Sequence, residues 1–164
     1  MSEAKPPSSA LAVLQKVPLF RELSPSQVKQ VFALCQHETH DAGWELCRAG
    51  TESDQLYVLL SGTVEVSSES GVLLARETAV TTIGETGVLT GEHRSAHVVA
   101  STPVSVLSLS RRAFLRVVQI DPALAVRLYR NVMFILRSKL MAANARIDEV
   151  VSAAGGGEDD TNST

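Results

Sequence analysis

The sequence is poor in aromatic residues and has no large excess of charge of either sign. Only 4% of its 164 residues are Phe, Trp or Tyr, although 45% are hydrophobic, so the core must be mainly aliphatic. The formal net charge is −3 and the isoelectric point is about 5.8, whereas nucleic-acid-binding modules are normally basic. These values argue against a DNA-binding function. The length is typical of one domain, or of one domain with an appendage.

Long apolar runs and a cysteine framework are also absent. No stretch approaches the roughly 18 consecutive apolar residues of a membrane-spanning helix, and the N-terminus, MSEAKPPSSA, lacks the basic-then-apolar order of a signal peptide. The two cysteines, Cys35 and Cys47, are too few for a disulfide framework. We interpret them as small hydrophobic residues in a reducing compartment. We therefore expect a cytoplasmic protein that does not enter a membrane.

The four histidines do not form a pattern typical of a metal site. His37 and His40 have the spacing H-x-x-H, while His93 and His97 fall on a predicted loop and a predicted strand. Neither pair places two ligands on one face of one strand. No nucleophile–base arrangement stands out either. We expect neither a metal cofactor nor an enzymatic activity.

The predicted secondary structure changes twice along the chain, from helix to strands and back to helix. Apolar spacing up to Cys35 is helical, and Ser24-Pro25-Ser26-Gln27 predicts a helix start with a capping box. Five apolar runs separated by turn signals then predict strands at 56–60, 63–66, 72–75, 96–100 and 104–109. Many short strands at such spacing predict an antiparallel sandwich or barrel.

Two further helices are predicted after the strands. Ser110 is a candidate N-cap for a short helix to about Ile120, and Asp121-Pro122 predicts the start of a helix that runs to about Ser152. Apolar residues in this long helix recur with a 3-4-3-4-3 spacing, at Met133, Leu136, Leu140, Ala143, Ile147 and Val150. We call these six residues the seam. Such a spacing is typical of a two-stranded coiled-coil contact, so we expect a parallel homodimer through this helix.

The segment from Gly84 to Ala96, GETGVLTGEHRSA, carries the chemistry of an anion site. Backbone N–H groups at a short helix start can bind a phosphate. The guanidinium of Arg94 adds charge and a planar pair of donors. Glu85 is an acceptor only, which suits a sugar hydroxyl.

This segment resembles the phosphate-binding cassette of cyclic nucleotide-binding domains. The family pattern reads roughly F-G-E, then apolar and small residues, and P-R-(small)-A after a short loop. Ile83, Thr86 and His93 depart from it at the Phe, first apolar and Pro positions. The residues that the resemblance assigns to the ligand are Gly84, Glu85, Thr86, Gly87, Arg94 and Ser95.

Three further blocks of sequence are similar to the same family, in the same order. They are LQKVPLF from Leu14 to Phe20, the AGWEL and AG pair between Ala42 and Gly50, and LYVLLSGTVEV from Leu56 to Val66. The resemblance thus spans about residues 12–152. It implies a mainly β fold: an eight-stranded antiparallel jelly-roll barrel with N-terminal helices and a long C-terminal helix.

The resemblance also implies a function and a division of the chain. Glu85 would accept from the ribose 2′-hydroxyl, Arg94 would bind the cyclic phosphate, and Ser95 leaves the choice between cAMP and cGMP open. A base cap would come from the long helix near Leu136, Ser138, Lys139 and Leu140. We expect disordered ends at 1–10 and 153–164 and a binding domain at 11–152, with the barrel at about 37–109 and helices at about 110–152.

The resulting hypothesis is a receptor that relays cyclic nucleotide occupancy to a partner protein through its C-terminal helices. No DNA-binding, kinase, cyclase or channel sequence follows the long helix, so we expect no output domain. The alternative is a ligand-independent interaction module that keeps the fold and dimerises through residues 133–150. The presence of both Glu85 and Arg94 favours the receptor.

Overall fold

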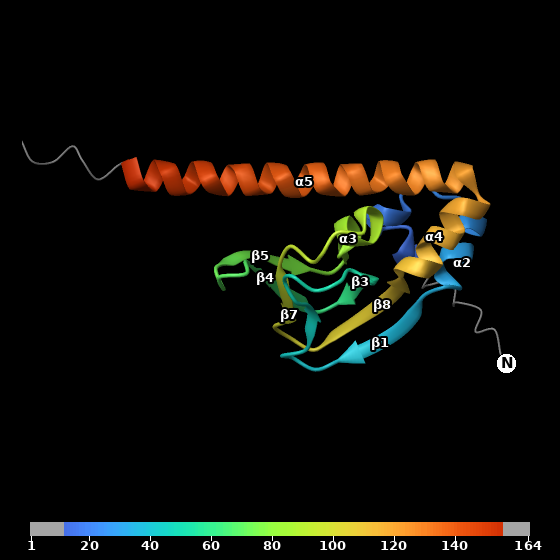
Figure 1. The fold of residues 1–164 in the computed structure, drawn as a ribbon, viewed down its shortest axis with the longest axis horizontal. Coiled ribbons are helices and arrows are strands. Elements are labelled where there is room, and N and C mark those ends of the chain that lie inside the picture. The colour runs from blue at the N-terminus through green and yellow to red at the C-terminus, as the bar shows by residue number, and fades with distance from the viewer. Residues whose placement is uncertain (1–11, 156–164) are drawn as a thin grey trace, which may run out of the picture. The chain divides into compact units, whose positions relative to one another are not determined.

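The structure, a computed structural model, describes residues 12–155 (Figure 1). It contains eight strands, a short 3-10 helix and four α-helices that can be delimited. In chain order these are η1 (Pro18–Phe20), α2 (Pro25–Phe32), β1 (Gln36–His40), β2 (Glu45–Cys47), β3 (Gln55–Ser61), β4 (Thr63–Ser67), β5 (Leu73–Thr78), β6 (Thr81–Ile83), α3 (Glu85–Thr90), β7 (His97–Ala100), β8 (Val104–Ser110), α4 (Arg111–Ile120) and α5 (Pro122–Gly155).

The strands pair as two antiparallel four-stranded sheets. One sheet has the order β1-β8-β3-β6 and the other the order β2-β7-β4-β5. Strands β5 and β6 follow each other along the chain but belong to different sheets, with no pairing between them among the described residues. The predicted antiparallel β fold is therefore confirmed. The predicted closure into one eight-stranded barrel is not confirmed, because each sheet keeps two edge strands.

The space between the sheets is filled mainly by aliphatic side chains, as the composition predicts. Trp44 and Val66 pack against this core while remaining partly exposed. The buried members of the cluster are Leu46, Cys47, Tyr57, Leu59, Val64, Ile83, Val98, Ala100, Val104 and Val106. Tyr57 is the aromatic member of this buried set, and its ring meets that of Trp44 edge to face. Burial of apolar area of this kind is the dominant stabilising term in a fold of this size.

The helix starts follow the predicted caps. The Ser24 hydroxyl accepts from Gln27 N at 3.2 Å and the Gln27 side chain accepts from Ser24 N at 3.1 Å, which completes the capping box. Ser110 Oγ accepts from Ala113 N at 3.2 Å and caps α4. Asp121 Oδ1 accepts from Leu124 N at 3.0 Å at the start of α5. All three predicted helix starts are confirmed.

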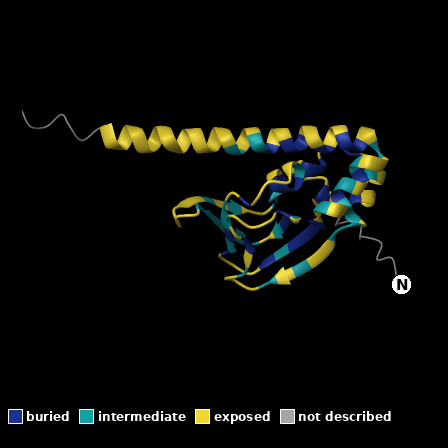
Figure 2. Cartoon of the chain, in the orientation of Figure 1, coloured by how far each residue is buried: buried dark blue, intermediate teal, exposed yellow. Residues whose placement is uncertain are grey.

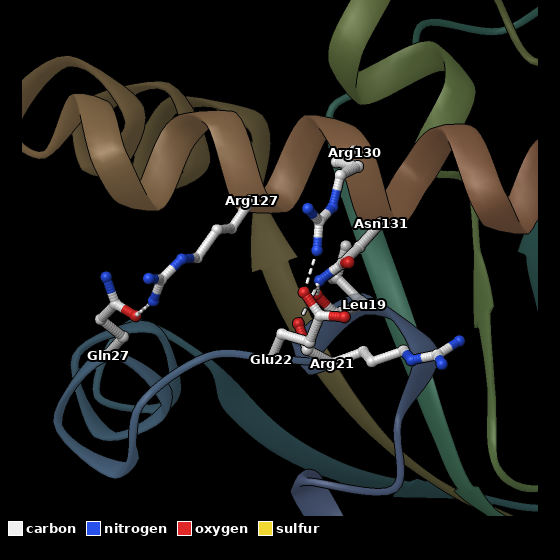
Figure 3. A network of polar contacts seen from close by, with 7 residues as sticks. All are labelled: Leu19, Arg21, Glu22, Gln27, Arg127, Arg130 and Asn131. Carbon is white, nitrogen blue, oxygen red and sulfur yellow. Dashed lines mark hydrogen bonds and ion pairs between the residues drawn. The ribbon is translucent and has the colours of Figure 1, made fainter.

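Helix α5 belongs to two compact units, because the described chain divides at Val132. Its first part, up to Val132, lies in the unit that holds both sheets. There Asn131, which is 2% exposed, donates to Leu19 O at 2.9 Å and to Arg21 O at 2.7 Å (Figure 3). Arg127 donates to the Gln27 side chain at 2.9 Å in the same network. These contacts connect the start of α5 to η1 and α2.

The second unit consists of the described residues from Met133 to Gly155, all of them helical. Every residue from Leu140 to Gly155 is exposed (Figure 2). Of the seam, Met133, Leu140, Ile147 and Val150 are each 59–69% exposed. Helix α5 continues three residues beyond its predicted end. Disorder is predicted for residues 1–10 and 153–164. Residues 153–155 are the last turn of α5, so the prediction is wrong for them. Residues 1–10 and 156–164 lie outside the described residues.

Candidate functional site

The cassette is a short helix held between two left-handed glycines. Strand β6 ends at Ile83, Gly84 has a φ of 80°, and α3 follows directly. Gly91, with a φ of 77°, ends the helix and leads into the loop that carries Arg94. Positive φ values are readily adopted by glycine, so the chain turns sharply at both ends of α3.

Arg94 is the buried cation of this cassette. It is 8% exposed, and its Nη2 donates to the backbone oxygen of Gln55 at 2.5 Å. Its Nη1 is also buried and has no hydrogen-bond partner among the described residues. The loop around it is fixed, because Arg94 N donates to Thr51 O at 2.8 Å. A buried charged donor without an acceptor is unfavourable, and an anion at Nη1 would remove that penalty.

Glu85 lies close to Arg94, at the first position of α3, and is 2% exposed. The Arg94 guanidinium packs against Gly84, the residue before Glu85. Burial raises the pKa of the Cys47 thiol to about 11, while the charge of Arg94 lowers this pKa and the charge of Glu85 raises it. The structure therefore buries both residues of the predicted ligand pair within electrostatic reach of the same thiol. A thiol with so high a pKa stays protonated and unreactive at neutral pH.

Two of the three cassette glycines, Gly84 and Gly87, are required by close packing. A Cβ at Gly84 would collide with the Arg94 guanidinium, and a Cβ at Gly87 would collide with the side chain of Ser53. These contacts hold α3 against Arg94 and against the loop before β3. We had assigned both glycines to ligand contacts, and the structure shows a packing requirement that the sequence did not reveal.

The other two predicted ligand residues, Thr86 and Ser95, lie on the surface of the cassette and are exposed. The Thr86 carbonyl accepts from Thr90 Oγ1 at 3.0 Å. Thr86 also lies within the first turn of α3, where backbone N–H groups have no acceptor inside the helix. Their contacts with a ligand remain predictions.

A hollow of about 290 Å³ reaches Arg94 from β2 and from the loop before β3. Its wall includes Cys47 and Tyr57, which the sequence analysis did not assign to the site. Burial raises the pKa of Tyr57 to about 12, so its hydroxyl remains a donor at neutral pH. Glu45 and Arg48 at the rim neutralise each other through an ion pair at 2.7 Å. Tyr57 lies in a block of sequence that resembles the family, but neither that resemblance nor any motif at Cys47 assigns these two residues to the site.

The four predicted base-cap residues lie on α5 in the second unit. Leu136 and Lys139 are half-buried, and Leu140 is 62% exposed. The Ser138 hydroxyl donates to Phe134 O at 3.0 Å within its own helix. This unit is described by itself, so the capping role of all four remains a prediction.

Metal-binding groups are not found in the described part of the chain, where no three His, Cys, Asp or Glu side chains gather closely enough to hold an ion. The same residues include no helix with the length and apolarity needed to cross a membrane.

Comparison with known families identifies the fold around this cassette. The sequence profile of the cyclic nucleotide-binding domain matches residues 37–121, just over half of the chain, including β1 to α4 and the entire cassette. The chain belongs to the cyclic nucleotide-binding domain family. The predicted family membership is thus confirmed.

Individual members show how widely this domain is used. The chain is 35% identical to Glutaminase 2 of Bradyrhizobium diazoefficiens over 79% of its own length and 21% of that protein. It is 33% identical to a cyclic nucleotide-gated potassium channel of Mesorhizobium japonicum, over 66% of this chain and 30% of the channel. This cyclic nucleotide-binding domain therefore spans about a fifth to a third of these two relatives.

A crystal structure gives the same picture of the fold. A cyclic nucleotide-binding domain from Methylobacillus flagellatus KT superimposes with a TM-score of 0.75 at 27% identity, covering 84% of this chain and 79% of that one.

Proposed function

We propose that the chain is a cytoplasmic receptor domain for a cyclic mononucleotide, with cAMP as the first candidate and cGMP as the second. The observation that carries this proposal is the Nη1 group of Arg94, which is buried at the end of the cassette without an acceptor among residues 12–155. The cyclic phosphate supplies the missing acceptor and charge. Family membership supports the assignment of the cassette to a cyclic nucleotide.

The remaining cassette residues complete the proposed binding mode. Glu85 accepts from the ribose 2′-hydroxyl, because a carboxylate is an acceptor only. The backbone N–H groups of Gly84, Thr86 and Gly87 face the phosphate, and Ser95 donates to it or to the base. No metal and no further cofactor is required for this chemistry. The proposed domain binds and does not catalyse.

A thermal melt with nucleotide tests the receptor proposal directly. A ligand at a hundred times its dissociation constant adds about 2.7 kcal/mol to the free energy of unfolding. We expect cAMP or cGMP to raise the melting temperature, and 5′-AMP, which lacks the cyclic phosphate, to raise it much less. Unchanged melting with both cyclic nucleotides at millimolar concentration would refute the receptor function.

For the output, we propose that nucleotide binding is relayed through α5 to a partner protein. In this proposal Leu136, Ser138, Lys139 and Leu140 form the base cap, and the seam joins two copies of the chain in a parallel homodimer. The exposed seam residues Met133, Leu140, Ile147 and Val150 support this proposal, because exposed apolar stripes are typical of interaction surfaces. A ligand shifts such a helix only through its different affinities for two conformations.

Light scattering tests the dimer. Replacing Leu140 and Ile147 together by Asp places charges in the seam, and an unpaired buried charge is too costly for a short interface. We expect a dimer for the parent and a monomer for the double variant. A matched double variant at the off-seam positions Arg137 and Lys139, each changed to Asp, should remain dimeric. A parent that is monomeric with and without nucleotide contradicts the dimer.

The alternative function, a ligand-independent interaction module, is favoured by the same exposed seam. It predicts a dimer that forms through residues 133–150 and that neither binds nor responds to cyclic nucleotide. The melt and the light-scattering experiment together separate the two functions.

A further inference from the structure

A second and larger cavity adjoins the cassette on the side of α4. It has a volume of about 830 Å³ and lies between the loop before β3, the end of the cassette and one face of α4. Neither Glu85 nor Arg94 lines it. It shares Glu52 and Asp54 with the smaller hollow at Arg94, so the two are neighbouring hollows with different cationic residues. The volume of the larger cavity is within the range of small-molecule sites, roughly 300–1,000 Å³.

One face of α4 forms the cationic wall of this cavity. Arg112, Leu115, Arg116 and Gln119 line it at the i, i+3, i+4, i+7 spacing of a single helix face. Phe114 and Val117, on the other side of the helix, are buried. The cavity wall is therefore a defined surface of a helix whose opposite face is fixed in the core.

The arginines of this wall have no carboxylate partner. The ion pairs found within residues 12–155 do not include Arg111, Arg112 or Arg116. Arg112 and Arg116 are four residues apart, and like charges at this spacing repel each other. Arg111 is held in place, because its Nε donates to Val88 O at 3.1 Å and its backbone N donates to Asp54 O at 2.7 Å. An anion between these side chains would relieve the repulsion.

The loop before β3 contributes acidic and hydroxyl groups to the same cavity. Ser53 lines the cavity and is 6% exposed, and its hydroxyl has no hydrogen-bond partner among the described residues. The carboxylates of Glu52 and Asp54 lie on the same wall and are exposed. Hydroxyl and amine groups are the natural partners of carboxylates. The cavity is thus lined both by cationic donors from α4 and by anionic acceptors from the loop before β3.

We propose that this cavity binds a small phosphomonoester whose body carries hydroxyl or amine groups. The α4 arginines take the phosphate, since guanidinium groups bind phosphate oxygens through paired charge-assisted hydrogen bonds. Glu52 and Asp54 accept hydrogen bonds from the body of the ligand. Ser53 lies on the buried wall between the phosphate end and the body. An acidic protein segment fits less well, because Glu52 and Asp54 repel a chain of carboxylates.

Calorimetric titration with glucose 6-phosphate tests the proposal, with inorganic phosphate and glucose as part-ligands. We expect saturable binding of glucose 6-phosphate, weaker binding of inorganic phosphate and none of glucose. Amide NMR shifts should concentrate on residues 52–55 and 111–119. The Arg112→Gln/Arg116→Gln variant should bind roughly tenfold more weakly or not at all, since it loses two charge-assisted contacts.

A control variant and a competition experiment make the result specific. Arg137→Gln/Arg146→Gln removes the same charge from exposed positions outside the cavity, and its affinity should equal that of the parent. Saturating cAMP should leave the affinity for glucose 6-phosphate unchanged, because neither Glu85 nor Arg94 lines this cavity. Binding of cAMP is measured separately, so failure of the cassette and failure of this site are distinguishable. The proposal is overturned by an absence of saturable binding, by equal losses in the two double variants, or by competition between cAMP and glucose 6-phosphate.

Discussion

Two buried polar side chains of the same compact unit differ in how their hydrogen bonds are satisfied. Asn131, on α5, uses both amide hydrogens on the carbonyl oxygens of Leu19 and Arg21. Arg94, in the cassette, uses Nη2 on the carbonyl of Gln55 and leaves Nη1 without an acceptor among the described residues. Burial is similar, at 2% and 8% exposure. The hydrogen bonds of Asn131 are complete in the folded chain, whereas Arg94 retains a donor that is free within residues 12–155 and that the ligand satisfies in our proposal.

This difference separates a structural polar group from a functional one. A satisfied buried group adds to stability, whereas an unsatisfied one costs stability that ligand binding can recover. Substitutions in the two regions should therefore affect different measurements. Those near Asn131 should lower the free energy of unfolding, and those near Arg94 should lower the affinity for nucleotide.

The largest expected effect is that of Arg94→Leu on nucleotide affinity. Truncating one partner of a buried charged pair costs about 2–5 kcal/mol of binding free energy, so calorimetry should detect no binding of cAMP. The fold should survive, because the guanidinium is not part of the apolar core. Arg76→Leu, at an exposed arginine paired with Glu65, is the control and should bind normally. Unchanged affinity in Arg94→Leu would refute the cassette assignment.

Glu85→Ala should have the next largest effect, and only on ligands with a 2′-hydroxyl. A hydrogen bond to a charged group contributes about 1.5–3 kcal/mol, so cAMP should lose this amount while 2′-deoxy-cAMP loses little. Competition binding with the two ligands measures the difference. Equal losses for both would mean that Glu85 holds the loop and does not contact the ribose.

Asn131→Ala tests the structural region. It leaves two buried carbonyl oxygens without their donor, which should lower the free energy of unfolding by about 1–3 kcal/mol. Urea denaturation measures this change, and nucleotide affinity measured on the folded protein should stay the same. Arg130→Gln is the control: its ion pair with Glu22 is exposed, so its loss should cost no more than about 1 kcal/mol. A larger loss from Arg130→Gln than from Asn131→Ala would contradict this ranking.

The smallest effect concerns Glu38, a half-buried group outside both regions. The Ser108 hydroxyl, which donates to the carboxylate, lowers the pKa of Glu38, burial opposes this shift, and His40 adds to it. A carboxyl whose pKa is lower in the folded than in the unfolded protein stabilises the fold. This contribution is fully present above the unfolded pKa, about 4.3, and is lost as the pH falls from there through the folded pKa. Glu38→Gln should therefore be less sensitive to acid between about pH 5 and pH 3. If the unfolding free energies of the parent protein and of Glu38→Gln changed in parallel with pH, this expectation would be wrong.

Local signals in the sequence predicted much of the fold. Ser24, Ser110 and Asp121 were identified as helix caps from residue type and spacing alone, because capping depends on neighbours within one turn. Strands such as β3 and β8 were visible as apolar runs. The division of the strands between two sheets was not predictable, since it depends on pairings between distant residues.

The ligand site remains a prediction, and its two charged residues carry a motif. The structure buries both Glu85 and Arg94, and both charges act on Cys47. Ser53 against Gly87, the Gln55 carbonyl on Arg94 and the amide of Asn131 carry no motif. Each of these is a contact between segments that meet only after folding, so neither residue type nor spacing in the chain predicts it.

Gly84 illustrates how a site can restrict its own evolution. Its φ of 80° excludes most side chains, and the guanidinium of Arg94 occupies the space of a Cβ. A single substitution at this position is therefore opposed by two independent barriers for as long as Arg94 is present. In a lineage that lost Arg94 the closest steric contact would disappear, while the backbone oxygen of Gln55, 3.1 Å from the same Cβ position, would still restrict a replacement. Asparagine, which tolerates such backbone angles best among the larger residues, is the replacement that loss of Arg94 would favour. The tolerance of position 84 for substitution therefore depends on the residue at position 94.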